Sequence, residues 1–82
     1  MRHQDFTPLQ GQYLAFIHLY SKVNGRPPAE KDMQRYFGVA PPTVHRMVVE
    51  LHRKGLVTRT TGPGTGRTLK VTLDTTELPP LD

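Results

Sequence analysis

Two arginines on one face of a predicted helix are the side chains of this 82-residue chain with the best spacing for chemistry. The helix is predicted over residues 43–54 by apolar residues at three- and four-residue intervals, namely Val44, Met47, Val48 and Leu51. At about 100° per residue, Arg46 and Arg53 fall opposite that apolar stripe. A guanidinium donates two hydrogen bonds at once to guanine O6 and N7, and it also binds phosphate. The pattern therefore favours a surface that contacts nucleic acid.

Other side chains share this face or follow it along the chain. We expect Arg46 to read a base edge, because the amino-terminal part of a DNA-reading helix is the part that reaches the bases. Thr43 and His45 can donate to phosphates or bases, and Val49 can touch a thymine methyl group. The complete set of predicted DNA-binding residues is Pro42, Thr43, His45, Arg46, Val49, Arg53, Lys54, Arg59 and Arg67.

The distribution of charge helps to separate a binding face from an ordinary solvated helix face, which is the alternative explanation for exposed arginines. The chain carries a formal net charge of +4 and has a pI near 9.9. Residues 41–70 hold six Lys or Arg and one acidic residue, Glu50, whereas residues 71–82 hold three acidic residues and no Lys or Arg. A solvated face usually mixes both signs, so the basic segment indicates a polyanionic partner.

The glycine-rich run at residues 62–66 resembles a phosphate-binding loop only superficially. A nucleotide-binding loop leads from a strand into a helix whose amino terminus holds the phosphate. Here the next predicted element is a second strand, so we expect a turn between strands whose glycines also allow close approach to a DNA backbone. We predict no nucleotide and no other cofactor.

The histidines do not form a metal site in the predicted arrangement. His45 and His52 are seven residues apart, about 10 Å along a helix, and His18 belongs to a different helix. The chain has no cysteine, and no carboxylate completes a tetrahedral ligand set. Since no Ser/His/Asp set or carboxylate pair has workable spacing either, we predict no metal site, no catalytic residues and no enzymatic activity.

Two further helices precede the basic one. The first starts at Thr7-Pro8, an N-cap followed by proline, and stops at Asn24-Gly25. Its predicted apolar stripe is Leu9, Tyr13, Phe16, Ile17 and Tyr20. The stiff connector Arg26-Pro27-Pro28 then leads to a second helix over residues 29–37, which Gly38 ends.

The connection between the second and third helices indicates a helix-turn-helix, because it has about four residues and contains a glycine. Residues 56–60 and 68–73 are rich in alternating β-branched residues, which predicts a hairpin with residues 61–67 at its tip. The predicted fold class is therefore mainly α with a small β-hairpin (α+β), a winged helix-turn-helix of three helices. We assign residues 1–73 to this domain and residues 74–82 to a flexible acidic tail.

The sequence resembles the amino-terminal DNA-binding domain of LexA-type repressors from about Phe6 to Leu73. The matching segments are Phe6-Thr7-Pro8-Leu9-Gln10, Gly25-Arg26-Pro27-Pro28-Ala29 and Leu51-His52-Arg53-Lys54-Gly55-Leu56-Val57. The resemblance implies a winged helix whose third helix, about residues 42–54, enters the major groove, with the wing at residues 61–67 on the backbone or in the minor groove. It also implies dimeric binding to a palindromic operator.

Two departures limit what the resemblance implies. LexA-like recognition helices begin with a Ser-Pro-Asn type of sequence, whereas this chain has Ala40-Pro41-Pro42 there, and it has His45-Arg46 where the family tends to place acidic residues. We therefore expect it to recognise an operator of its own. Full repressors continue into a self-cleaving serine–lysine peptidase domain, which the sequence ending at Asp82 does not include, so we do not expect autoproteolysis.

The function that these observations favour is a sequence-specific, double-stranded DNA-binding transcriptional regulator, with repression implied by the resemblance. The alternative is a winged-helix protein-interaction module without DNA specificity of its own, since fold alone does not fix function. We expect no small-molecule ligand, no membrane partner and a cytoplasmic location, because neither a signal peptide nor a membrane span is evident. A lone domain makes few DNA contacts, so we expect a monomer or weak homodimer that pairs on DNA.

Overall fold

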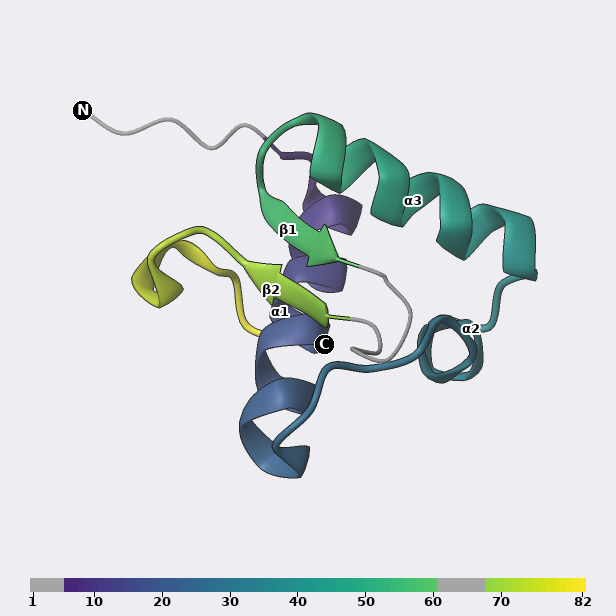
Figure 1. The fold of residues 1–82 in the computed structure, drawn as a ribbon, viewed down its shortest axis with the longest axis horizontal. Helices are drawn as coiled ribbons and strands as arrows, with labels where there is room; N and C mark the ends of the chain where they lie inside the picture. Colours follow the sequence, from purple (N-terminus) through teal and green to yellow (C-terminus); the bar gives the residue numbers. More distant parts are fainter. Residues whose placement is uncertain (1–5, 61–67) are drawn as a thin grey trace.

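Three helices precede a two-stranded antiparallel sheet in the computed structural model, which describes residues 6–60 and 68–82 (Figure 1). The elements are α1 (Pro8–Asn24), α2 (Glu30–Phe37), α3 (Pro41–Arg53), β1 (Val57–Thr60), β2 (Thr68–Val71) and the 3₁₀ helix η1 (Thr75–Glu77). This order confirms the predicted mainly α architecture with a small β-hairpin. The predicted wing tip, residues 61–67, lies outside the described residues. No helix in the described ranges is long and apolar enough to cross a membrane.

Caps at both ends define α1 as the sequence predicts. The Thr7 hydroxyl accepts a hydrogen bond from the Gln10 backbone N–H at 3.1 Å, and Gln10 Oε1 accepts from the Thr7 N–H at 3.0 Å. Pro8 occupies the first turn, where a missing N–H is tolerated. Gly25 ends the helix at φ 71°, a left-handed conformation that favours glycine.

A short turn joins α2 to α3 and forms the helix-turn-helix. Gly38 adopts φ 66° and donates its N–H to the carbonyl of Gln34, which ends α2. α3 starts at Pro41, earlier than the predicted start at Thr43, because prolines fit the first turn of a helix. The structure brings α3 into contact with α2 on one side and with β1 on another.

The sheet turns one face towards the core. β1 and β2 pair with Thr58 opposite Lys70 and Arg59 opposite Leu69. Val57 and Leu69 are buried, whereas Thr58 and Lys70 are exposed, so the two faces of the sheet differ as alternation requires. The predicted alternation is thus confirmed, and it puts Arg59 on the sheet face that bears Val57.

Side chains from all three helices and both strands form the hydrophobic core. Its most completely enclosed members are Tyr13, Leu14, Ile17, Met33, Val44, Leu51 and Val57. Tyr13 stacks on Phe37 with ring centroids 4.0 Å apart, which ties α1 to α2. The sequence placed Leu9 in the apolar stripe of α1, but Leu9 is 54% exposed, because it lies in the first turn at the edge of the buried face. Leu14 takes a central core position instead.

The segment after β2 packs against α1, whereas the sequence predicted a flexible tail for residues 74–82. Gln12 Nε2 donates to the carbonyl of Pro80 at 2.9 Å, and the Asp82 N–H donates to Gln12 Oε1 at 2.8 Å. The Tyr36 hydroxyl of α2 donates to the carbonyl of Asp82. Two partly buried leucines of the segment pack against the core, Leu78 and Leu81. The terminal position suggested flexibility, but apolar anchors and hydrogen bonds from side chains of α1 and α2 to its backbone hold the segment in place.

Candidate nucleic-acid interface

The outward face of α3 carries most of the predicted DNA-binding residues. Val44, Val48 and Leu51 are buried, so the opposite side of the helix is turned away from the core. The predicted contacts that are exposed on this outward face are Pro42, His45, Arg46, Val49 and Arg53. Thr43, in the first turn, is partly buried. The structure therefore brings five of the nine predicted residues together on one accessible surface, which we call the α3 face.

Prolines change the chemistry at the start of α3. A helix normally begins with free backbone N–H groups that can bind phosphate. Pro41 and Pro42 have no N–H, and the Thr43 N–H donates to the Ala40 carbonyl at 3.0 Å. Ala40 provides no side-chain cap. Anion binding at this end of α3 therefore depends on side chains rather than on the backbone.

Arg46 is the arginine of the α3 face that is free to bind a ligand. It is exposed, and its side chain makes no hydrogen bond or ion pair with any residue in the described ranges. Its position in the first half of α3 matches the part of a recognition helix that reaches base edges. Binding through Arg46 therefore requires ordering of its side chain but no exchange of an existing partner.

Arg53 is exposed but engaged with Glu50 on the same helix. Arg53 Nε donates to Glu50 Oε1 at 3.1 Å, and Nη2 donates to Oε2 at 2.5 Å. These hydrogen bonds, and then the positive charge of Arg53, hold the pKa of Glu50 below its ordinary value. The Glu50 carboxylate in turn raises the pKa of Arg53. Since the Arg53 side chain is 69% exposed, water screens the pair, and Arg53 can exchange Glu50 for another anion.

His45 is joined to α2 by Glu30. Nδ1 of His45 lies 3.3 Å from Oε2 of Glu30, which belongs to the first turn of α2. The contact links the α3 face to the preceding helix of the helix-turn-helix. Sequence reasoning did not include Glu30 in the site, because a separation of 15 residues between two helices gives no periodic signal.

Lys54 connects the end of α3 to the start of α1. Its Nζ donates to Gln10 Oε1 at 3.0 Å, the same oxygen that accepts from the Thr7 N–H in the cap of α1. Gln10 is only 8% exposed, whereas Lys54 itself is exposed, so the contact lies at the surface over a buried acceptor. The sequence assigned Lys54 to the DNA-binding set, and the structure gives its ammonium group an internal partner.

The two predicted contacts on the wing are not part of the α3 face. Arg59 lies in β1, where it is partly buried on the sheet face that bears Val57. Arg67 lies outside the described residues. Figure 1 shows that β1 points towards the side of the molecule on which α3 begins.

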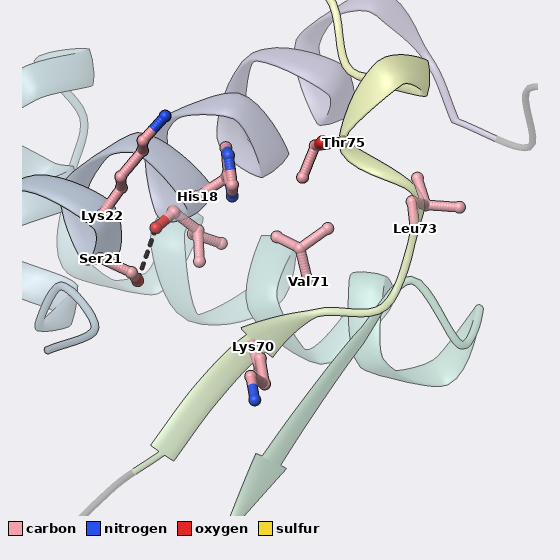
Figure 2. Close-up of a pocket in the computed structure, with 8 residues that line it drawn as sticks. His18, Ser21, Lys22, Lys70, Val71, Leu73 and Thr75 are labelled. Atoms are coloured by element: carbon pink, nitrogen blue, oxygen red, sulfur yellow. Dashed lines mark hydrogen bonds between the residues drawn. The ribbon is translucent and has the colours of Figure 1, made fainter. Parts of the chain in front are cut away.

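A pocket between α1 and β2 is another location to consider for a site (Figure 2). It has a volume of about 290 Å³, and its polar lining includes His18, Ser21, Lys22 and Lys70. The Ser21 hydroxyl already donates to the Ile17 carbonyl at 2.7 Å, and Lys22 and Lys70 extend in opposite directions. No group of three His, Asp or Glu side chains within residues 6–60 and 68–82 is placed to hold a metal ion. Because its polar groups do not converge, we place the candidate site on the α3 face instead.

Comparison with known proteins agrees with the resemblance drawn from the sequence motifs. The profile of the family described as LexA DNA binding domain matches residues 3–68. A LexA repressor of Oleidesulfovibrio alaskensis is 38% identical over 68 residues, which cover 83% of this chain and 33% of that protein. A LexA repressor of Thermosipho melanesiensis is 34% identical over 56 residues, which cover 68% of this chain and 28% of that protein. The chain thus spans about a third of the length of these relatives.

Proposed function

The chain belongs to the LexA DNA-binding domain family, and from that membership we propose that it is the DNA-reading domain of a sequence-specific transcriptional repressor. The observation that supports this most directly is Arg46, an exposed arginine with no partner among the described residues. It belongs to the second helix of the helix-turn-helix, the helix that enters the major groove in proteins of this fold. The partner we propose is double-stranded DNA.

Side chains of the α3 face offer complementary chemistry for the major groove. We assign Arg46 to guanine, because its guanidinium matches the O6 and N7 acceptors. Val49, at 42% exposed, offers methyl groups to the C5-methyl of thymine. Arg53 contacts a backbone phosphate after exchanging its Glu50 partner, and Thr43 donates to a phosphate near the start of the helix. Pro42 shapes the first turn that presents these groups.

The remaining members of the predicted set take different roles in this proposal. Lys54 holds α3 against α1 through Gln10, so its effect on DNA binding is indirect. Arg59 and Arg67 are kept as contacts of the wing with the DNA backbone or minor groove, a role supported by the sequence pattern and the winged-helix resemblance. Two copies of the domain are proposed to pair on adjacent half-sites, because one module buries limited DNA surface.

Selection of bound sequences from a pool of random duplexes tests the proposal. We expect enrichment of one motif with inverted half-sites, and the apparent affinity should fall linearly with salt concentration on logarithmic axes. Arg46→Ala should reduce the enrichment of the motif. The control is Lys22→Ala, which removes the same charge near the end of α1, and this end lies far from α3 in Figure 1. The Lys22 variant should retain the motif.

The same selection distinguishes the alternative protein-interaction module. Such a module has no DNA specificity of its own, so no motif would be enriched and wild type would bind every duplex alike. That result, or absence of binding at low salt, would overturn the proposed function.

A further inference from the structure

A carboxylate on α2 reaches the α3 face at His45. Oε2 of Glu30 lies 3.3 Å from Nδ1 of His45, at hydrogen-bond distance. The Glu30 side chain is 31% exposed and that of His45 is 57% exposed, so the imidazole ring is anchored on one side and accessible on the other. Arg46, its neighbour on α3, is also exposed. The imidazole ring of His45 is therefore anchored next to Arg46, on the face that we propose contacts DNA.

The contact decides which ring nitrogen carries the proton. An ionised carboxylate can only accept a hydrogen bond, so Nδ1 of His45 must be the donor. A neutral imidazole carries a single N–H, and the hydrogen bond made by one nitrogen sets the state of the other. With the proton on Nδ1, Nε2 is a hydrogen-bond acceptor. It lies on the far side of the ring from the atom bonded to Glu30.

We propose that Glu30 is a positioning residue that fixes the tautomer of His45, so that Nε2 of His45 accepts a hydrogen bond from a base amino group. This inference rests on the proposed function and adds a specificity rule to it. In the major groove, cytosine N4 and adenine N6 are donors, whereas guanine O6 and N7 and thymine O4 are acceptors; adenine also has an acceptor, N7, beside its donor. His45 held by Glu30 therefore prefers adenine or cytosine at the position that it reads.

Substitution of Glu30 tests the rule through base identity rather than through affinity. Glu30→Gln offers Nδ1 either an acceptor or a donor, so the preference should relax. Glu30→Lys offers only donors, so Nδ1 must accept and Nε2 becomes the N–H donor. Cytosine, which has no acceptor in the major groove, should then be disfavoured, and guanine or thymine should be gained. A residue that merely supports the fold would alter affinity or stability without exchanging one class of base for the other.

The experiment uses the full 82-residue chain and a duplex library in which each position of the selected motif is varied. The position read by His45 is the one whose preference disappears in His45→Ala. Binding of wild type and of every variant is measured in the same buffer at pH 8. We expect wild type to favour adenine or cytosine there by about 3- to 10-fold, the order expected for one hydrogen bond. Glu30→Gln should reduce that ratio, and Glu30→Lys should reduce it further and invert the preference for cytosine over guanine or thymine.

A double substitution separates the tautomer effect from the added charge of lysine. In the His45→Ala background, Glu30→Lys should raise affinity for all duplexes alike and leave base preference unchanged. Circular dichroism confirms that each variant is folded, and Glu30→Gln serves if Glu30→Lys is unstable.

Two kinds of result would overturn the inference. The first is normal DNA binding in which Glu30→Gln and Glu30→Lys keep the wild-type preference, and the second is a His45→Ala variant that loses no preference at all. Wild-type protein that fails to bind any duplex would instead reject the proposed function itself.

Discussion

Arg53 and Glu50 form a two-point ion pair on the α3 face, with an Nη2–Oε2 distance of 2.5 Å and an Nε–Oε1 distance of 3.1 Å. The pair places the one acidic residue of segment 41–70 beside a proposed phosphate contact. Unliganded Arg53 is therefore occupied, unlike Arg46. DNA has to compete with Glu50 for Arg53, and it also meets the repulsion of the carboxylate itself.

Replacing the acidic partner should strengthen DNA binding. Glu50→Gln removes a negative charge from the α3 face and leaves Arg53 free for phosphate, so we expect affinity for the selected duplex to rise by about three- to tenfold at low salt. Fluorescence anisotropy titrations at two salt concentrations measure this, and the gain should shrink at high salt. Unchanged or weaker binding by Glu50→Gln at low salt would show that Arg53 does not reach phosphate.

The same pair should be visible in the titration of free protein. Hydrogen bonds from Arg53 keep the pKa of Glu50 below its ordinary value, so Arg53→Met should return it towards that value. NMR titration of the Glu50 carboxyl carbon measures the pKa of Glu50 in wild type and in Arg53→Met. Because the folded pKa is the lower one, the stabilisation from the pair is present above the unfolded pKa and is lost as pH falls through the folded pKa. Equal Glu50 pKa values in the two proteins would mean that the pair does not persist in solution.

Two adjacent valines on α3 should respond differently to substitution by alanine, one through stability and the other through base preference. Val48 is 3% exposed, so Val48→Ala should lower the free energy of unfolding by about 2 kcal/mol through two lost buried methyl groups and the cavity they leave. Val49 is 42% exposed, so Val49→Ala should change stability by less than about 0.5 kcal/mol. It should instead reduce preference for thymine in the selected motif. Urea denaturation and duplex selection check the two effects, and a Val49→Ala variant with unchanged selection would remove Val49 from the site.

The segment after β2 should be ordered through Gln12. Gln12→Ala removes the hydrogen bonds to Pro80 and Asp82, so we expect a loss of stability of about 1 kcal/mol and faster exchange of the Asp82 amide hydrogen. Val23→Ala, at an 81% exposed position of the same helix, is the control and should alter neither. Hydrogen exchange by NMR measures the protection. An Asp82 amide that exchanges at the rate of an unfolded chain in wild type would restore the flexible tail predicted from the sequence.

Local signals were sufficient to predict the helices and the apolar side of α3. Thr7, Gly25 and Gly38 mark helix ends by backbone preferences that depend only on neighbouring residues, and the structure uses them in that way. The apolar spacing of α3 correctly separated its buried side from the side that bears Arg46. Helix-end residues and apolar spacing are both local signals, because each depends only on residues that are close together in the sequence.

Contacts between distant parts of the chain account for what the sequence did not predict. Lys54 meets Gln10 across 44 residues, and Asp82 meets Gln12 across 70. No helical or strand period relates such positions, so Lys54 appeared to be a free basic group. The pairing of Arg53 with Glu50 is different, since a separation of three residues on a helix is a recognised spacing for an ion pair. That pair was open to prediction.

The most direct test of the central claim compares Arg46→Ala with wild type on the selected duplex and on a scrambled duplex of equal length. If Arg46 reads a base, the ratio of the two affinities should fall by roughly 5- to 150-fold, equivalent to about 1–3 kcal/mol of discrimination, while binding to the scrambled duplex changes much less. Lys22→Ala should keep the wild-type ratio. An equal loss of affinity of Arg46→Ala for both duplexes, or an unchanged ratio, would contradict the assignment of the α3 face as the sequence-reading surface.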